Sequence, residues 1–449
     1  MLTVRRSTAV AGPPSAVADT LRTSPSATAA TLRRVGARTS EFPTPIGEGL
    51  RRETCSLSSN TSSTQTEVLV VGASLSGLCA AYSAARSGAR TLLIDAAPEV
   101  GARPNPATLL MELLWRHTAL PIPQGALERE LSGLRLGGPC GQGPLFRLRI
   151  LHLDRRTFDR AFAERAAEAG VTVLSGVRVR GTLPSGGVLT EGGPMRAQVS
   201  IFADGANSAV REVMPTVRNP HEMAWGLAHL LEAPGLGEPS CFEVRFGSFA
   251  PGWRAQLNPL GGDRASLWTF ARGVPREALG GYAERARRAF LGPKEVKIVE
   301  ESGGVDPAFV VPHQIVGDGA MACGAAAGQG GLEYGARAGL LAGEVAARAV
   351  RAGDVSRRAL QPYEKIWRRE TAVESLALRW GMGALSRLSD AELDGLFGRF
   401  SGVEFCEEDV LALLRGDPRG ALRRVGLGRS ARTVMELARG CFFPLRSPL

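Results

Sequence analysis

The stretch Glu67-Val-Leu-Val-Val-Gly-Ala-Ser-Leu-Ser-Gly-Leu-Cys-Ala-Ala81, with Thr91-Leu-Leu-Ile-Asp95 soon after it, decides the fold. It predicts a buried strand, a glycine turn, a helix and a second strand that ends in an acidic residue. This is the layout of a dinucleotide-binding βαβ unit. Gly72 allows the tight turn and Gly77 lets the helix pack closely on the sheet, while the helix N-terminus attracts a pyrophosphate. Asp95 stands where a carboxylate would hold a ribose hydroxyl.

Ser74 occupies the position of the middle glycine of the usual fingerprint. It adds a side chain where the backbone approaches a phosphate most closely. An ordinary strand-helix-strand unit without a ligand is therefore the alternative to a cofactor site.

Length and composition indicate a globular protein of two or three domains. The chain has 449 residues, of which 44% are hydrophobic and 22% charged, and it has no apolar run near the ~18 residues that cross a bilayer. The seven cysteines are scattered without any C-x-x-C spacing, which argues against a disulfide framework or a zinc site and favours a cytoplasmic location. The five histidines show no metal-ligand spacing either.

The net charge of +10 is unevenly distributed. Arginines gather in residues 1–52 and 410–449, without the interleaved aromatic residues of a nucleic-acid-binding surface. Residues 1–64 are rich in Ser, Thr and Arg and predict a disordered leader, for which an organelle transit peptide is the alternative. The basic helices near the C-terminus could contact an anionic membrane surface, or simply present a solvated arginine face.

The strand-helix-strand order continues beyond Asp95. Apolar spacing predicts a helical stretch at Leu109–Trp115 and a helix that opens at Asp154 and ends at Gly170. A strand at Val199–Ala203 runs into Asp204-Gly205, and the glycine-rich segment Gly324-Ala-Ala-Ala-Gly-Gln-Gly-Gly331 precedes a helix at Leu332–Val350.

Residues 224–272 follow an alternating pattern, which predicts an antiparallel sheet inserted into the nucleotide-binding fold. Several bulky residues of this region either line an apolar substrate cavity or form a plain sheet core. They are Phe242, Phe246, Trp253, Trp268 and Phe270. From about Leu360 the chain is expected to be helical, with a capping box at Ser389–Glu392.

The order and spacing of three segments, at Gly72–Asp95, at Ala203–Arg211 and before Leu332, resemble the FAD-dependent oxidoreductases of the para-hydroxybenzoate hydroxylase fold. Within that superfamily, Leu153-Asp-Arg-Arg-Thr-Phe-Asp-Arg-Ala-Phe162 resembles the Arg-x-x-Phe-Asp segment of the geranylgeranyl reductase family. The run from Tyr363 to Asp394 resembles that family's helical tail.

The resemblance implies an α/β fold with α+β insertions. A Rossmann-like FAD-binding domain would comprise residues 65–220 and 305–352, and an antiparallel substrate domain would comprise 221–304. Residues 353–449 would form a C-terminal helical region, and 1–64 the leader.

The resemblance also implies roles for individual residues. Gly72, Ser76 and Gly77, with Ser74 between them, would face the pyrophosphate, and Asp95 the adenosine ribose. Arg103 and Arg155 would lie at the flanks of the cofactor. Asp204 and Gly205 would form the wall shared with incoming NAD(P)H, a transient co-substrate. Backbone N–H groups at Gly330, Gly331 and Leu332 would meet the flavin ring.

This sequence departs from the family pattern in three segments. An aspartate of the family's Gly-Asp motif is expected at Gly324-Ala325, where the chain has alanine; Gly317-Asp318 is the alternative register. We favour the first register because Ala320–Cys323 makes the better strand. The family's aromatic substrate-sheet motif is replaced by Gly252-Trp-Arg-Ala-Gln-Leu-Asn-Pro259, and its cysteine-bearing loop by Arg103-Pro-Asn-Pro-Ala107.

The resemblance implies an enzyme that passes hydride from NAD(P)H through flavin N5 to a small, unsaturated, apolar acceptor, isoprenoid-like or a pathway intermediate. A flavin monooxygenase of the same fold is the first alternative. A degenerate flavin- or lipid-binding protein without turnover is the second.

Overall fold

The structure contains two large sheets, and the first is a mostly parallel sheet in which β1 (Gln65–Val71) is a central strand. Its strands follow the order β17–β18–β11–β1–β2–β8. Those from β18 to β8 are parallel, and β17 is antiparallel to β18. The other members are β2 (Thr91–Asp95), β8 (Thr172–Ser175), β11 (Gly193–Phe202), β17 (Val316–Gly317) and β18 (Ala320–Ala322), with β9 (Val179–Thr182) and β10 (Val188–Thr190) attached through β11. Val68, Leu69 and Val70 are fully buried, as expected for strands covered on both faces.

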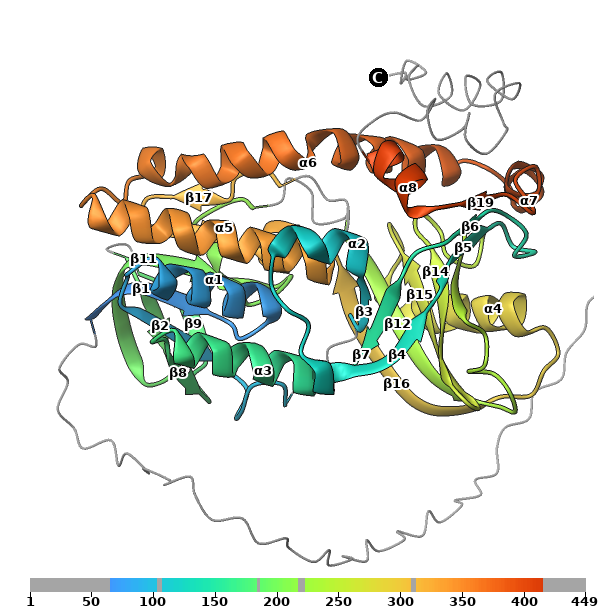
Figure 1. The fold of residues 1–449 in the computed structure, drawn as a ribbon, viewed down its shortest axis with the longest axis horizontal. Helices are drawn as coiled ribbons and strands as arrows, with labels where there is room; N and C mark the ends of the chain where they lie inside the picture. Colours follow the sequence, from blue (N-terminus) through green and yellow to red (C-terminus); the bar gives the residue numbers. More distant parts are fainter. Residues whose placement is uncertain (1–64, 103–106, 184–185, 217–222, 308–311, 415–449) are drawn as a thin grey trace, which may run out of the picture. The chain divides into compact units, whose positions relative to one another are not determined.

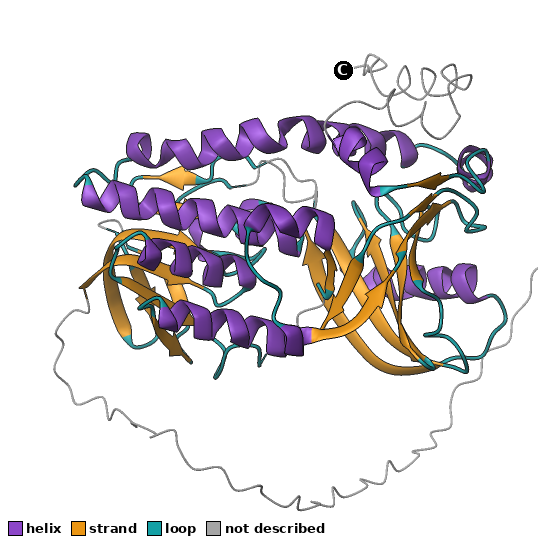
Figure 2. Ribbon diagram, in the orientation of Figure 1, coloured by secondary structure: helices purple, strands orange, loops and turns teal. Residues whose placement is uncertain are grey.

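This computed structural model describes residues 65–102, 107–183, 186–216, 223–307 and 312–414 (Figure 1). All of them belong to one compact unit, Thr61–Leu449. Figure 2 shows helices packed beside the parallel strands, and a second sheet in the other half of this unit. The expected leader, residues 1–64, lies outside the described residues.

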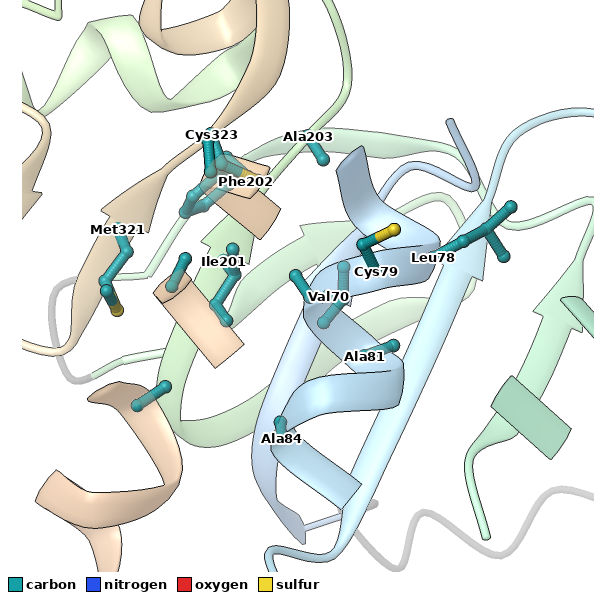
Figure 3. Packing of buried hydrophobic residues seen from close by; sticks show 14 of the residues in the cluster. Val70, Leu78, Cys79, Ala81, Ala84, Ile201, Phe202, Ala203, Met321 and Cys323 are labelled. Carbon is teal, nitrogen blue, oxygen red and sulfur yellow. The ribbon is translucent and has the colours of Figure 1, made fainter. Parts of the chain in front are cut away.

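Helix α1 (Leu75–Arg86) packs between the parallel sheet and α5 (Leu332–Arg351). Figure 3 shows Ala81 and Ala84 of α1, which belong to the same buried cluster as Leu78 and as Val70 and Ile201 of the sheet. The alanines of α1 let the helix lie close to the strands, because a small side chain takes up little space between the two. Helix α3 (Arg155–Glu168) begins at Asp154, whose side chain accepts a hydrogen bond from the Arg156 N–H, as the sequence predicts.

Helices α1 and α5 run parallel to each other in unusually close contact. A Cβ on Gly339 would lie 2.1 Å from the carbonyl oxygen of Ser76, and a Cβ on Gly343 would lie 2.1 Å from that of Ala80. Since these pairs advance in the same direction along both helices, the two N-termini point to the same edge of the sheet. The N-terminus of α5 extends nearly two turns beyond that of α1, because Gly339 is the eighth residue of α5 and Ser76 is the second of α1.

The second sheet has the order β16–β12–β15–β14–β13–β5–β6–β19. Its strands are β5 (Gly133–Gly137), β6 (Leu145–Phe146), β12 (Ala224–Glu232), β13 (Cys241–Arg245), β14 (Ala255–Gly261), β15 (Arg264–Ala271), β16 (Lys297–Asp306) and β19 (Glu404–Phe405). It is antiparallel except at the pairs β13–β5 and β6–β19. Helix α4 (Leu279–Leu291) packs against β12 and β15.

Three strands of this sheet come from outside the predicted range 221–304. Strands β5 and β6 precede it, and β19 lies in the region expected to be helical. Leu134 and Leu136 of β5 pack with Phe242 and Val244 of β13 in one cluster. Pairing with β5 therefore completes an apolar face that β13 only begins.

The C-terminal helices cover that cluster. Helix α6 (Arg357–Leu385) contributes Met382 and Leu385, α7 (Asp390–Gly398) contributes Leu393 and Phe397, and α8 (Glu407–Leu414) contributes Val410. The capping box at the start of α7 is confirmed in full: Ser389 and Glu392 each bind the backbone N–H of the other.

The predicted helical stretch at Leu109–Trp115 is only half right. Its first part is strand β3 (Leu109–Met111), and only Glu112–Trp115 is helical, as α2. Strand β3 pairs with β7 (Ile150–Leu153), which also pairs with β4 (Leu127–Leu131), so a distant partner overrides the local apolar spacing. None of the helices described here is long and apolar enough to cross a membrane.

Candidate functional site

The glycine turn after β1 has the tight geometry that its sequence predicts. Gly72 has φ +100°, and a Cβ there would lie 2.6 Å from the carbonyl oxygen of Ala203. A Cβ on Gly77 would lie 1.9 Å from the carbonyl oxygen of Gly72. Both positions therefore require glycine, one for its backbone conformation and both for space.

Ser74 precedes the first turn of α1 without capping it. Its hydroxyl donates to the carbonyl oxygen of Ala203 at 3.0 Å and lies 3.0 Å from the Ser76 hydroxyl. The first turn of α1 also carries no acidic residue. The backbone N–H groups in the first turn of α1 therefore carry a partial positive charge that no acidic side chain of this turn neutralises. This suits an anion such as a pyrophosphate.

Asp95, at the end of β2, holds the turn in place. One carboxylate oxygen accepts from the Ala73 N–H at 2.8 Å, and the other from the Ala97 N–H at 2.7 Å. Each oxygen retains a further lone pair, so a ribose hydroxyl can still donate to this half-buried carboxylate.

The end of β11 lies directly beside the glycine turn. Ala203 donates its N–H to the carbonyl oxygen of Val71 at 2.8 Å. Asp204 follows on the exposed side, where it accepts from the Ala209 N–H at 3.0 Å. Gly205, with φ +94°, has no atom within 4 Å of a Cβ position, so the backbone is open there.

The glycine-rich segment reaches the same edge from β18. The Cys323 N–H donates to the carbonyl oxygen of Phe202, and a Cβ on Gly324 would lie 2.3 Å from the Ser76 hydroxyl oxygen. The predicted strand at Ala320–Cys323 is therefore confirmed as β18, Ala320–Ala322, and Ala325 follows it at this edge. Asp318, in the alternative register, precedes β18 and so lies at the opposite edge, where it accepts from the N–H of Arg357 at the start of α6.

Two fully or nearly buried side chains fix the path of this segment. The Gln329 side chain accepts from the Gly324 N–H at 2.8 Å and donates to the Tyr363 hydroxyl at 3.0 Å. Tyr363, on α6, donates to the carbonyl oxygen of Ala322 at 2.9 Å. Tyr363 is predicted from the sequence only as part of a helical tail, because nothing in its local pattern indicates a buried hydroxyl.

Helix α5 begins at Leu332, directly after Gly331, which has φ +93° and makes no capping bond. Glu333, in the first turn of α5, is not among the site residues predicted from the sequence. This carboxylate is 6% exposed and accepts from the Met111 N–H of β3. Burial raises its pKa to about 7. The available signal was an acidic residue placed among glycines and alanines.

Arg155 is buried at the start of α3. Its guanidinium donates to Asp159 at 2.9 Å and 3.1 Å and to the carbonyl oxygen of Ala107 at 2.5 Å. Burial raises the pKa of Asp159, although the Arg155 charge opposes that rise. Arg103, the other predicted flanking residue, lies outside the described residues.

The five predicted aromatic residues are buried, but none of them lines a cavity that borders the antiparallel sheet. That cavity, of about 420 Å³, lies at the α4 side of β12. Its side chains include Trp225, Leu227, Arg276 and Glu301. Trp268 and Phe270 instead stack on each other, with ring centroids 5.3 Å apart.

Comparison with known proteins decides the family. The profile of the FAD dependent oxidoreductase family matches residues 67–212. Digeranylgeranylglycerophospholipid reductase 1 of Methanothermobacter thermautotrophicus is 31% identical over 389 residues, which cover 80% of this chain and 98% of that protein. The chain belongs to the geranylgeranyl reductase family of FAD-dependent oxidoreductases.

Other similarities agree with this membership. A second reductase of this name from the same organism is 30% identical, over 78% of this chain and 95% of its own length. The crystal structure of a geranylgeranyl bacteriochlorophyll reductase-like protein from Thermoplasma acidophilum shares the fold, with a TM-score of 0.69 at 22% identity, covering 81% of this chain and 99% of that one. A flavin-dependent brominase shares it more distantly, with a TM-score of 0.57 at 16% identity, over 71% of this chain and 87% of that one.

The site of this geranylgeranyl reductase family member fits FAD on three features of its own. The Arg155 Nε is buried without a hydrogen-bond partner among the described residues. The N-termini of α1 and α5 lack side-chain caps at Ser74 and Gly331. The turn at Gly72 packs too tightly against Ala203 for a side chain, and the backbone beside it is open at Gly205, where a pyrophosphate could approach.

Proposed function

We propose that this protein is a reductase that holds FAD at the shared edge of α1 and α5 and saturates a carbon–carbon double bond of an isoprenoid-type lipid. When bound, FAD supplies the chemistry: hydride from NAD(P)H is accepted at flavin N5 and delivered to one alkene carbon, while the other carbon takes a proton. NAD(P)H is thereby oxidised to NAD(P)⁺ and the alkene is reduced.

The observation that carries the proposal is that the N-termini of α1 and α5, neither of which has a side-chain N-cap, reach the same sheet edge. Gly324 approaches the Ser76 hydroxyl, and Gly339 approaches its carbonyl oxygen, so α5 and the glycine-rich segment both pack against the first turn of α1. One N-terminus suits the pyrophosphate. The other suits the flavin end that gains negative charge on reduction.

The protein's own residues would bind FAD, orient it and shield it from water. Ser76 and Gly77 would offer N–H groups to the pyrophosphate, and Asp95 would accept from the adenosine ribose. The Arg155 Nε would donate at the cofactor's flank, and Asp204 and Gly205 would border the path of the nicotinamide. Gly330 and Gly331 would bring the start of α5 against the flavin ring.

An isoprenoid acceptor is supported by the names of the relatives, which are reductases of digeranylgeranylglycerophospholipids. The described structure contributes an apolar cluster in the antiparallel sheet, where Trp253, Trp268 and Phe270 lie with Met382 of α6. We propose peripheral contact with a membrane surface as the route by which a lipid of this kind arrives.

The test begins with the absorption spectrum of the purified full chain, before and after addition of FAD. The protein is then mixed anaerobically with NADPH or NADH and an unsaturated isoprenoid lipid, and the lipid is examined by mass spectrometry. We expect flavin bleaching by at least one nicotinamide and a lipid mass gain of about two hydrogens per reduced bond.

A protein that stays colourless after FAD is added would contradict cofactor binding. Bleaching without any change in the lipid would contradict the acceptor. Oxygen-dependent product formation would identify a monooxygenase instead.

A further inference from the structure

Glu333 is an acidic side chain in an unusual position. It is the second residue of α5, 94% of its surface is buried, and it bridges to β3 by accepting from the Met111 N–H. No ion pair joins it to an arginine, lysine or histidine within the described parts of the chain. Burial is the main cause that raises its pKa, and the N–H groups of Glu333 and Met111 oppose it.

The charged and titratable groups on the elements around α5 are mostly engaged elsewhere. Arg337 of α5 pairs with Glu370 of α6, and Arg116 pairs with Glu112. The thiol of Cys323 has its pKa raised to about 12 by burial, and burial raises the pKa of Tyr363 as well. Other groups include Glu364, which pairs with Arg368 on α6, exposed His117 between α2 and β4, and the buried thiol of Cys79 on α1, whose pKa burial raises. Burial also raises the pKa of Asp204 at the end of β11.

We propose that Glu333 is the proton-holding residue of the FAD site, taking up a proton as FAD binds and donating a hydrogen bond to the flavin edge. This inference rests on the proposed function, which puts that edge at the start of α5. Because the carboxyl group is already shielded from water, the flavin acts on it by bringing acceptor atoms toward it. A charged carboxylate has no proton to offer those acceptors, whereas a neutral carboxyl group donates one.

The proton uptake determines whether FAD affinity rises or falls with pH. Free Glu333 has a pKa of about 7, and bound FAD shifts that pKa further upward. Between the two values, binding takes up a proton, so affinity falls as pH rises. The dissociation constant is expected to increase by up to about tenfold per pH unit above neutrality.

The test is an FAD titration of the full chain, stripped of flavin, on both sides of the Glu333 pKa, from about pH 6 to about pH 8.5. Calorimetry in two buffers of different ionisation enthalpy measures the proton uptake directly. In Glu333→Gln, the amide oxygen can still accept from the Met111 N–H, but the side chain cannot titrate. We expect the wild type to lose affinity as pH rises and to take up a proton, and Glu333→Gln to do neither.

Two matched variants separate Glu333 from its surroundings. Glu344→Gln removes an exposed carboxylate from the same helix, where it pairs with Arg348. His117→Asn removes a nearby residue of a type that changes charge between about pH 5 and 8. Both are expected to keep the pH dependence of the wild type.

The inference is overturned if wild-type binding is independent of pH and takes up no proton, or if His117→Asn abolishes the effect. It is also overturned if Glu333→Gln keeps the pH dependence. If Glu333→Gln does not fold, the proton uptake measured for the wild type and for His117→Asn still tests the inference. Absence of FAD binding at every pH would overturn the proposed function together with this inference, so the two failures are distinguishable.

Discussion

Ala325 is the residue at which this chain departs most clearly from the resembling family near the proposed flavin. It is half-buried at the same sheet edge as Gly72 and Ser76. We expect Ala325→Asp to tighten FAD binding about fivefold, because one added hydrogen bond contributes about 1 kcal/mol. Fluorescence titration with FAD measures the change.

The control for this change is Asp318→Ala. Asp318 lies at the opposite edge, where its carboxylate accepts from the Arg357 N–H at 2.7 Å. This variant is expected to lower the free energy of unfolding by about 1 kcal/mol and to leave FAD affinity unchanged. Equal effects of the two substitutions on FAD affinity would contradict the chosen register.

Tyr363 supports the site from a distance. Its hydroxyl joins the carbonyl oxygen of Ala322 to the side chain of Gln329, and Gln329 in turn holds the Gly324 N–H. Tyr363→Phe leaves these buried groups without a partner, at a cost of about 1–3 kcal/mol. We expect a lower free energy of unfolding and weaker FAD binding, measured by urea denaturation and by titration. Unchanged values for both would show that the network does not hold the segment.

Glu333 also predicts how stability changes with pH in the protein without FAD. Its pKa rises from 4.5 to about 7 on folding, so the folded state holds the proton more strongly. The free energy of unfolding therefore falls as pH rises from about 4.5 to about 7. Glu333→Gln should lack this fall and exceed the wild type by up to about 3 kcal/mol at pH 8. Parallel pH profiles in urea denaturation would contradict the assignment.

At the scale of the elements, the parallel packing of α1 on α5 sets the geometry of the site. Gly339→Ala puts a Cβ 2.1 Å from the backbone carbonyl oxygen of Ser76, so the helices must separate. We expect a loss of about 1–3 kcal/mol in unfolding free energy, even though alanine favours a helix. Weaker FAD binding should accompany it, because the two N-termini would no longer meet.

Gly381→Ala is the matched control, since a Cβ there meets no atom within 4 Å in helix α6. It should stabilise the protein by about 0.5–1 kcal/mol through helix propensity alone. Thermal denaturation of the two variants compares them directly. Stabilisation by Gly339→Ala would show that α1 and α5 are not in close contact.

At the scale of the whole molecule, the sequence predicts what local patterns encode. The run from Glu67 to Asp95 specifies β1, α1 and β2. Its apolar residues indicate the buried strands, its glycines indicate the turn and the closely packed helix, and its terminal acid marks the end of the second strand. The capping box at Ser389 is equally local. The strand at Ala320–Ala322 was predictable because its apolar run ends in glycines.

What the sequence could not predict depends on partners far along the chain. Leu109–Met111 becomes a strand because β7 pairs with it, and Glu404–Phe405 joins the antiparallel sheet because β6 pairs with it. The buried positions of Glu333 and Tyr363 depend on β3 and on the glycine-rich segment. Only the folded structure brings these segments together.

The central claim is that FAD lies across the edge where the N-termini of α1 and α5 meet. A crystal structure of the full chain with FAD tests it most directly. We expect pyrophosphate oxygens within hydrogen-bond distance of the Ser76 and Gly77 N–H groups, and the flavin ring at Gly331 and Leu332. FAD bound elsewhere, or with its flavin ring away from the start of α5, would contradict it.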